Sequence, residues 1–248
     1  MEKKTDKNLY TMLFATGMVI VVGSLLAFVA SSLRPKIDEN KRIEKQQNIL
    51  YAMGVNENEG SSDVNFVSKD KVADEFSKYI TEQIVIEGNS ITENNKAYLI
   101  DIKKEQNNAK EGNTRKLPLF IGQKEGKTFY IVPIRGKGLW DAIWAYVAMD
   151  KDMVVQGVFF DHKGETAGLG SNIKERFFMD DFIGEHLFSN GEFEGIEVIK
   201  GNADPKNIDK EDNEVDAIAG ATLTGNGVTS MMRSDLKLYV PYFKTLKK

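Results

Sequence analysis

The chain lacks cysteine and contains only two histidines, His162 and His186, among its 248 residues. Without thiolates it cannot form disulfides, hold zinc through sulfur, ligate an iron–sulfur cluster or use a cysteine nucleophile. The absence does not fix the compartment, because a cysteine-free chain tolerates both oxidising and reducing conditions. The two histidines are far apart in the sequence, which argues against a histidine-rich metal site.

An excess of basic residues is also missing. The formal net charge is −4, whereas nucleic-acid-binding domains usually carry a basic patch, so we expect no nucleic-acid partner. Charged residues make up 28% and hydrophobic residues 41% of the chain, as in ordinary folded domains. The length suits one sizeable domain, or a modest domain with an anchor.

One long hydrophobic run lies near the N-terminus. No charged residue occurs between positions 8 and 33, and residues 12–29 can cross a hydrocarbon core of roughly 30 Å at about 1.5 Å per residue. A cleavable signal peptide ending near residues 29–31 is the alternative, but its apolar region usually has only about 7–15 residues. We therefore expect a tail at 1–10, a single transmembrane helix at 11–33 and a domain at 34–248.

Charge does not decide which side of the membrane the domain occupies. Basic residues flank the run on both sides, at positions 3, 4 and 7 and at positions 34, 36, 41 and 42. The positive-inside rule applies to short loops, and long domains translocate largely regardless of charge.

The remaining pattern predicts an α+β fold, with a single N-terminal transmembrane helix followed by a domain that has an antiparallel sheet and flanking helices. Helices are expected at 35–53 with a stop at Gly54, at 69–81 with Asp70 as cap, at 172–183 with Ile173, Phe177 and Phe182 on one side, and at 222–239 ended by Pro241. Strands are expected at 98–102, 128–134, 139–149, 153–160 and 195–200, with a turn at 150–152. Residues 56–63 and 201–214 are polar and are predicted to form loops, and the mostly polar region 84–116 shows no strand pattern outside 98–102.

The segment 216–228 is a turn of small residues that leads into a helix. Ala219, Gly220 and Ala221 leave room for another molecule to approach the backbone. Thr222 would lie near the helix N-terminus, where unpaired N–H groups and the positive dipole end favour phosphate. On these grounds alone, a plain N-cap threonine after a tight turn is the preferred interpretation.

The same segment resembles a known modification motif. Flavin transferases recognise Asp-x-x-(Ser/Thr)-Gly-Ala-Thr and esterify its threonine with the phosphate of FMN, using FAD as donor. Asp216, Gly220, Ala221 and Thr222 match, whereas Ala219 departs from the motif and removes a hydroxyl beside the acceptor. The longer run Gly-Ala-Thr-Leu-Thr-x-Asn-Gly-Val resembles the family of the C subunit of the Na⁺-translocating NADH:quinone oxidoreductase.

Two further stretches support this family. Gly-Lys-Gly-Leu-Trp at 136–140 resembles its segment ahead of a strand, and Gly-Glu-Thr-Ala-Gly-Leu-Gly at 164–170 resembles its loop beside the flavin. Taken alone, each has an ordinary explanation. Residues 168–170 could be a glycine turn, Trp140 and Trp144 could be core or interface aromatics, and Glu165 could be a solvated carboxylate. Their joint occurrence in the family's order favours the resemblance.

The resemblance implies FMN bound covalently through a phosphoester to Thr222 and not to Thr224, whose hydroxyl we expect to bond back to a carbonyl one turn earlier. Further cofactor-binding residues implied are Trp140, Glu165, Thr166, Gly168, Leu169, Gly170, Gly220, Ala221 and Leu223, with Asp216 recognised by the flavin transferase. No catalytic or metal-binding residue is expected, because the flavin ring performs the redox chemistry.

The implied function is electron transfer within a Na⁺-pumping NADH:quinone oxidoreductase, in a bacterial inner membrane, with the domain on the periplasmic side. Expected partners are the other members of a complex of six different subunits, a flavin transferase during maturation and the lipid bilayer. In such a complex another subunit oxidises NADH, and electrons continue from this FMN to a second one in the B subunit. Two alternatives remain: the G subunit of an Rnf-type complex, which carries the same motif, and a cofactor-free anchored interaction domain.

Overall fold

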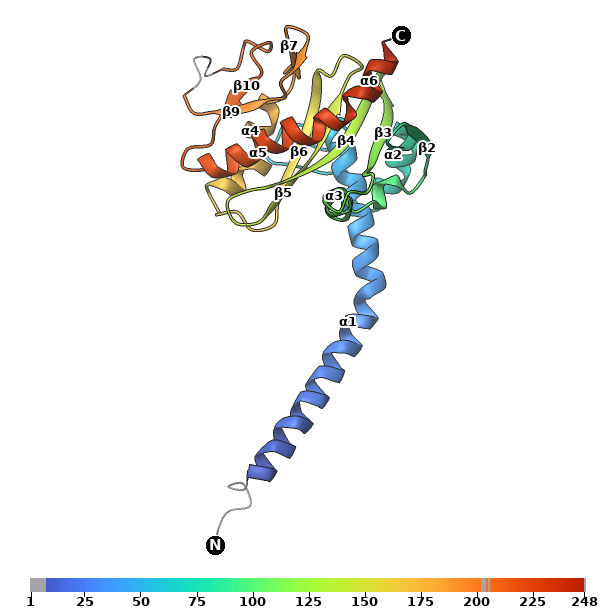
Figure 1. Cartoon of the computed structure of the whole chain (residues 1–248), viewed down its shortest axis with the longest axis vertical. Coiled ribbons are helices and arrows are strands. Elements are labelled where there is room, and N and C mark those ends of the chain that lie inside the picture. Colours follow the sequence, from blue (N-terminus) through green and yellow to red (C-terminus); the bar gives the residue numbers. More distant parts are fainter. Residues whose placement is uncertain (1–7, 202–203, 205, 248) are drawn as a thin grey trace. The chain divides into compact units, whose positions relative to one another are not determined.

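The computed structural model describes residues 8–201, 204 and 206–247 (Figure 1). The chain divides into two compact units, residues 1–42 and residues 43–248, and helix α1 (Asn8–Ala52) contributes to both. Residues 1–7 of the predicted tail lie outside the described residues.

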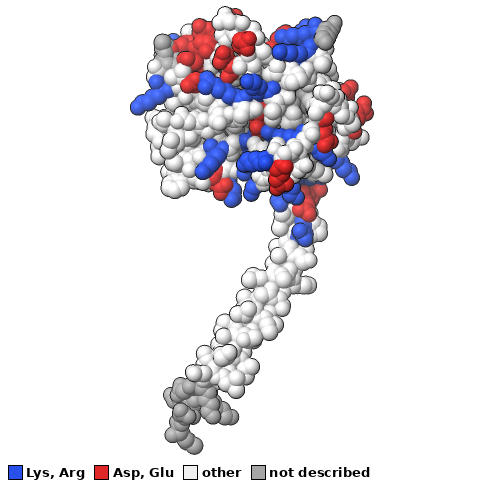
Figure 2. All heavy atoms as spheres, in the orientation of Figure 1, with Lys and Arg blue, Asp and Glu red and all other residues white. Residues whose placement is uncertain are grey.

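Helix α1 is exposed and apolar over its first half. Its most apolar 18-residue window has a mean hydropathy of 2.4, and in the described part of the chain it is the one helix long and apolar enough to cross a membrane. Figure 2 shows this stretch without acidic or basic side chains. The helical conformation predicted at 35–53 is confirmed up to Ala52, but it is not a separate helix, because α1 continues through Pro35 without a break. The stop at Gly54 (φ +76°) is confirmed.

The second unit contains a six-stranded antiparallel sheet of order β2-β1-β3-β4-β5-β6. Its strands are β1 (Ile80–Glu87), β2 (Ser90–Glu93), β3 (Lys116–Lys124), β4 (Lys127–Lys137), β5 (Ala142–Met149) and β6 (Val155–His162). The α+β class, the strands predicted at 128–134, 139–149 and 153–160, and the turn at 150–152 are therefore confirmed.

The mostly polar region 84–116 contains strands that its sequence pattern did not reveal, and the one strand predicted in it is wrong. Strand β1 pairs with β3 through its buried Ile84, Val85 and Ile86, and β2 is an exposed edge strand. The strand expected at 98–102 is instead the short 3₁₀ helix η2 (Ala97–Leu99) and the start of helix α3 (Ile102–Lys110). Charged residues interrupt the hydrophobic pattern of β1, whose pairing depends on β3, a long-range partner that the local sequence does not reveal.

Several helix limits also differ from expectation. Helix α2 (Val72–Tyr79) begins after Lys71, so Asp70 is not its cap, and residues 80–81 already belong to β1. The helix predicted at 172–183 is split into the 3₁₀ helix η3 (Gly170–Lys174) and helix α4 (Arg176–Asp181). Ile173 and Phe182 are buried as predicted, but Phe177 is 60% exposed and Phe178 is buried in its place, because the break between the two helices changes the register.

The C-terminal part consists of helix α5 (Thr222–Leu236), the 3₁₀ helix η4 (Lys237–Tyr239) and helix α6 (Val240–Leu246). The start at Thr222 is confirmed. Pro241 does not end a helix but lies in the first turn of α6, where its missing N–H needs no partner. The short strands are β7 (Phe188–Ser189), β8 (Glu192–Phe193), β9 (Glu197–Ile199), within the predicted strand at 195–200, and β10 (Glu214–Asp216), which begins at the last residue of the loop predicted at 201–214.

Helix α5 is held closely against the sheet and so fixes the position of its own N-terminus (Figure 1). A Cβ atom added to Gly136 of β4 would lie 2.9 Å from Met231 Cβ, and one added to Gly227 would collide with the carbonyl oxygen of Lys137. At the other end of the helix, the buried Asp235 pairs with Arg115 at 2.9 Å and accepts a hydrogen bond from the backbone of Arg135 at 3.0 Å. These contacts leave α5 little freedom to shift.

Candidate functional site

Three segments far apart in the sequence meet at the carboxylate of Glu165. Its Oε1 accepts a hydrogen bond from the backbone N–H of Trp140 (3.0 Å), and Oε2 accepts from the N–H of Leu139 (3.2 Å) and the hydroxyl of Thr224 (2.5 Å). Glu165 is only 7% exposed, so it is not a solvated loop carboxylate. It ties the segment after β4, the loop after β6 and the first turn of α5 into one site.

The same contacts determine the charge of Glu165. Burial raises the pKa of this carboxyl, but the hydrogen bonds from Thr224, Trp140 and Leu139 together outweigh burial and hold the pKa below its usual value. The backbone N–H of Glu165 donates to Nδ1 of His162 at 3.2 Å, which fixes the start of the loop. The site therefore contains a buried, ionised carboxylate whose hydrogen bonds come from the protein itself.

Glycines allow the three segments to approach so closely. A Cβ atom added to Gly138 would lie 2.6 Å from Oε1 of Glu165, and one added to Gly170 would lie 2.8 Å from Oε2. Gly220 has φ +76°, and its added Cβ would lie 2.9 Å from the Leu169 side chain. Gly168 also has a left-handed backbone (φ +75°), but open space surrounds it.

The two threonines of the first α5 turn have different surroundings. Thr222 begins the helix and is exposed, after a turn closed by a hydrogen bond from the Ala221 N–H to the Ile218 carbonyl (3.0 Å). Thr224 is 2% exposed and donates to Glu165, so the expected back-bond to a carbonyl is wrong: the carboxylate is the stronger acceptor. Thr222 thus keeps a hydroxyl that a second molecule can reach.

A small hollow of about 140 Å³ lies among these segments. It brings together eight predicted site residues, namely Glu165, Thr166, Leu169, Gly170, Gly220, Ala221, Thr222 and Leu223, and also Leu139 and Thr224. Trp140 lies next to it, because its indole N–H donates to the Thr166 hydroxyl at 3.0 Å. Gly168 belongs to the same loop. Asp216 ends β10, six residues before Thr222, and is half-buried.

Sequence reasoning missed three residues of this site: Leu139, Thr224 in its role as donor to Glu165, and His162. Leu139 and Thr224 lie inside motifs already identified in the sequence, so their proximity to the site could be predicted, but their contacts could not. His162 has no local signal, because its contact with the backbone of Glu165 depends on the shape of the loop.

The rim of the hollow is apolar and exposed. Leu139 is 43%, Trp140 67%, Leu169 39% and Leu223 59% exposed. The first intrahelical hydrogen bond of α5 runs from Gly225 N–H to the Ala221 carbonyl (2.9 Å), so the amides of residues 222–224 precede the helical ladder. An exposed hydroxyl, amides suited to an anion and an apolar rim fit the phosphate and ring of a flavin nucleotide.

Fold and site together define a flavin-binding domain that follows a single long apolar helix. A model of the FMN-binding domain family matches residues 138–237, a range that includes all three segments of the site. Among curated proteins, the C subunit of the Na⁺-translocating NADH-quinone reductase of Vibrio alginolyticus is 29% identical over 92% of this chain and 90% of its own length. The corresponding C subunit of Pseudomonas aeruginosa is 27% identical over 90% and 88%.

Solved structures agree with these relatives. The crystal structure of the C subunit from Parabacteroides distasonis is 30% identical, superposes with a TM-score of 0.71, and corresponds to 85% of this chain and 96% of that chain. The crystal structure of Shewanella oneidensis NqrC is 26% identical, superposes with a TM-score of 0.67, and corresponds to 84% of this chain and 98% of that chain. The chain belongs to the family of the C subunit of the Na⁺-translocating NADH-quinone reductase, which confirms the resemblance inferred from the motifs.

Proposed function

We propose that this chain relays electrons within a Na⁺-translocating NADH-quinone reductase through FMN attached to Thr222 by a phosphoester. The observation that carries the attachment site is the contrast between two threonines. Thr222 is exposed at the open end of α5, whereas Thr224 is buried and bonded to Glu165. A transferase can reach the first hydroxyl without unfolding the helix, but not the second.

The residues of the chain have distinct tasks in this proposal. The amides of residues 222–224 and the positive end of the α5 dipole hold the phosphate. Leu139, Leu169 and Leu223 offer an apolar surface to the ring, and the hydrogen bond to Thr166 orients Trp140 beside it. When bound, the isoalloxazine ring supplies the redox chemistry, so the chain needs no acid, base or nucleophile of its own.

The size of the hollow explains why a covalent bond is useful. Pockets that retain a small molecule by burial usually have volumes of about 300–1,000 Å³, whereas this one has about 140 Å³. The flavin would therefore lie mostly on the surface, where its ring can approach a redox partner. A phosphoester retains a cofactor that burial alone would not hold.

Attachment can be tested by co-expressing the full chain with a flavin transferase and inspecting the denatured protein under ultraviolet light. Wild type, Thr222→Ser and Thr224→Ala should fluoresce, and Thr222→Ala should be dark. The tryptic peptide of the wild type should carry FMN on Thr222, a readout that does not depend on whether Thr224→Ala folds. Fluorescent Thr222→Ala protein would overturn the assignment, and colourless wild-type protein would favour the cofactor-free interaction domain.

Asp216 supplies a separate test of how the transferase recognises the chain. We expect Asp216→Asn to slow FMN attachment without preventing folding, because its side chain is half-buried at the end of a short strand and precedes the acceptor by six residues. Equal initial rates of attachment for Asp216→Asn and wild type would remove Asp216 from the recognition motif. The Ser or Thr missing at Ala219 predicts that Ala219→Ser is modified faster than wild type.

The membrane arrangement is also part of the proposal. The tail would occupy residues 1–10, the transmembrane helix 11–33 and the FMN-binding domain 34–248, with the domain on the periplasmic side of a bacterial inner membrane. The apolar first half of α1 supports the span, and the use of a covalent cofactor supports a location without a flavin pool. A reporter fused after Lys248 that works only when exported should be active, whereas activity of a cytosol-only reporter would contradict the placement.

The exposed rim suggests how the domain meets other subunits. Leu139, Trp140, Leu169 and Leu223 form an apolar surface around the site, as expected where another protein approaches. We propose that neighbouring subunits of the reductase dock here. One would deliver electrons taken from NADH, and another would accept them from the flavin and pass them on toward quinone. Replacing Leu223 by Lys should slow electron transfer in the assembled complex while FMN content stays unchanged.

A further inference from the structure

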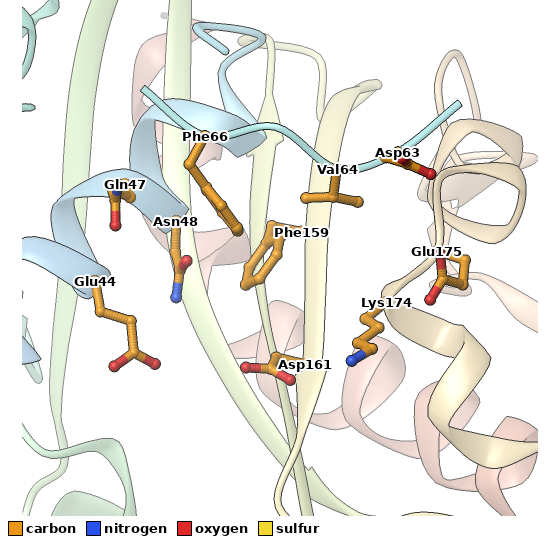
Figure 3. Close-up of a pocket in the computed structure, with 10 residues that line it drawn as sticks. All are labelled: Glu44, Gln47, Asn48, Asp63, Val64, Phe66, Phe159, Asp161, Lys174 and Glu175. Atoms are coloured by element: carbon orange, nitrogen blue, oxygen red, sulfur yellow. The ribbon is translucent and has the colours of Figure 1, made fainter. Parts of the chain in front are cut away.

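A second and larger hollow lies in the same unit, with no residue in common with the flavin site. Its volume is about 460 Å³, within the usual range for pockets that bind small molecules. The C-terminal end of α1, residues 63–66, strand β6 and residues 174–175 form its walls (Figure 3). None of the motifs of the family lies here.

Asn48 is the most informative residue of this hollow. It is 4% exposed, lines the hollow and, in the part of the chain that the structure describes, its side-chain amide makes no hydrogen bond. The neighbouring Gln47, by contrast, donates to the carbonyl of Val67 at 2.6 Å. The polar atoms of the Asn48 amide are open to the hollow, so a ligand that enters it can form the hydrogen bonds that the chain leaves available there.

The charges around the hollow indicate the sign of that ligand. Its walls carry four carboxylates and one ammonium group, a net charge of −3 when all are ionised. Figure 3 shows the carboxylates of Glu44 and Asp161 pointing with the Asn48 amide toward a common space. Burial raises the pKa of Asp161, although the hydrogen bond from the His162 backbone N–H and the charge of the Lys174 ammonium oppose this shift. A cation in the hollow would stabilise the ionised form of Asp161.

An aromatic wall completes the hollow. The rings of Phe66 and Phe159 lie edge-to-face with centroids 5.3 Å apart, and Tyr51 packs against both at 5.4 and 5.6 Å. Such rings bury apolar surface and attract cations placed over their faces. A ligand that matches both walls has a cationic head and an apolar body.

We propose that this hollow binds a small organic cation: a primary ammonium or guanidinium group on a short apolar body. Asn48 and Asp161 would bond the cationic head, and Phe66 and Phe159 would pack against the body. The same chemistry can come from a free amine or from a Lys or Arg side chain of a neighbouring subunit. The proposal does not depend on the flavin.

The test uses the full chain, isotope-labelled, in micelles of an uncharged detergent, with benzylamine as probe. Titration should shift the Asn48 side-chain amide resonances in a saturable way, whereas benzyl alcohol and benzoate should bind at least about tenfold more weakly. Asp161→Asn should weaken the binding of benzylamine by about tenfold, since it removes a charge-assisted hydrogen bond. The exposed Asp74→Asn, outside the hollow, and Thr222→Ala should behave as wild type.

No saturable shift at Asn48, equal binding of benzyl alcohol, or unchanged affinity in Asp161→Asn would each overturn the proposal. Should Asp161→Asn fail to fold, Glu44→Gln supplies the same comparison on the other side of the hollow. The assembled complex distinguishes the two sources. Benzylamine that binds both the isolated chain and the complex indicates a free amine, and binding to the isolated chain alone indicates a side chain of another subunit.

Discussion

The hydroxyl of Thr224 donates a 2.5 Å hydrogen bond to Oε2 of Glu165, and both residues are buried. This contact joins the loop after β6 to the first turn of α5, although the two residues are 59 positions apart. Because Glu165 also accepts from the backbone of residues 139 and 140, one carboxylate fixes the relative positions of the first turn of α5, the glycine loop and the apolar rim.

A double-mutant cycle can measure this contact. Hydrogen bonds to charged groups contribute about 1.5–3 kcal/mol, so Glu165→Gln and Thr224→Val should show a coupling energy of that size in urea unfolding. Thr128 of β4 accepts an exposed hydrogen bond from the Gln123 side chain and makes no contact with Glu165. Combining Glu165→Gln with Thr128→Val should therefore give additive effects on stability. A coupling below about 0.5 kcal/mol for the first pair would mean that the contact does not organise the site.

The left-handed backbone of Gly168 gives a second prediction, about the proposed contact of its loop with the flavin. The space around its Cα is open, so bulk alone is tolerated, but φ +75° strains a β-branched side chain. Gly168→Val should alter the spectrum or potential of bound flavin, or block its attachment, whereas Gly168→Asn should remain close to wild type because asparagine tolerates this conformation. Unchanged flavin content, spectrum and potential in Gly168→Val would separate this loop from the cofactor.

The close packing of α5 on β4 gives a third prediction. Alanine usually stabilises a helix by up to about 1 kcal/mol relative to glycine. At Gly227, however, the added Cβ would collide with the backbone carbonyl of Lys137, which cannot rotate away. We expect Gly227→Ala to lower the free energy of unfolding by about 2 kcal/mol. Gly164→Ala, where nothing lies within 4 Å, should stay within about 0.5 kcal/mol of wild type, and equal effects of the two would contradict the packing argument.

The sequence was most informative where function and local pattern coincide. The hydrophobic run of α1, the hairpin of β5 and β6, and the start of α5 at Thr222 follow from local signals. The motifs also located the segments that meet at the site, because each combines glycines with polar residues that a packed core would not need. Their mutual contacts were not predictable, since Glu165 and Thr224 become neighbours only when the sheet forms.

Long-range pairing accounts for the errors. Charged residues interrupt the hydrophobic pattern of strand β1, which is stabilised by pairing with β3, and the paired residues are 29–42 positions apart in the sequence. The break between η3 and α4 buries Phe178 and not Phe177, and no local periodicity indicates where such a break falls. Tertiary context overrode local pattern in both places.

The ion pair of Arg115 and Asp235 gives a fourth prediction, about stability. Both side chains are nearly buried, at 11% and 6% exposure, and the pair holds the last turn of α5. Removing one partner of a buried pair leaves an uncompensated charge, so Asp235→Ala should destabilise the domain by about 3–5 kcal/mol. Asp141→Ala breaks an exposed pair with Lys163 and should cost at most about 1 kcal/mol. Similar losses in both variants would contradict a special role for Asp235.

Glu185 gives the last prediction, on pH. Its side chain is fully buried, 3.3 Å from the Lys210 ammonium, and hydrogen-bonded to Asn207 at 2.9 Å. Burial raises its pKa from 4.5 to about 7, although Lys210 and Asn207 oppose this shift. The folded state therefore binds this proton more tightly than the unfolded state does. Its contribution to stability is complete below pH 4.5 and is lost as the pH rises to about 7.

The shift corresponds to roughly 3 kcal/mol across that window. Urea unfolding of wild type and Glu185→Gln should therefore give curves that diverge between pH 4.5 and 7, because glutamine cannot lose a proton. The variant should gain stability relative to wild type as the pH rises. Carboxyls with lowered pKa values, such as Glu165, contribute in the opposite direction, but they are common to both proteins and cancel in the difference. Parallel curves would show that Glu185 titrates normally, with Lys210 and bound water compensating its burial.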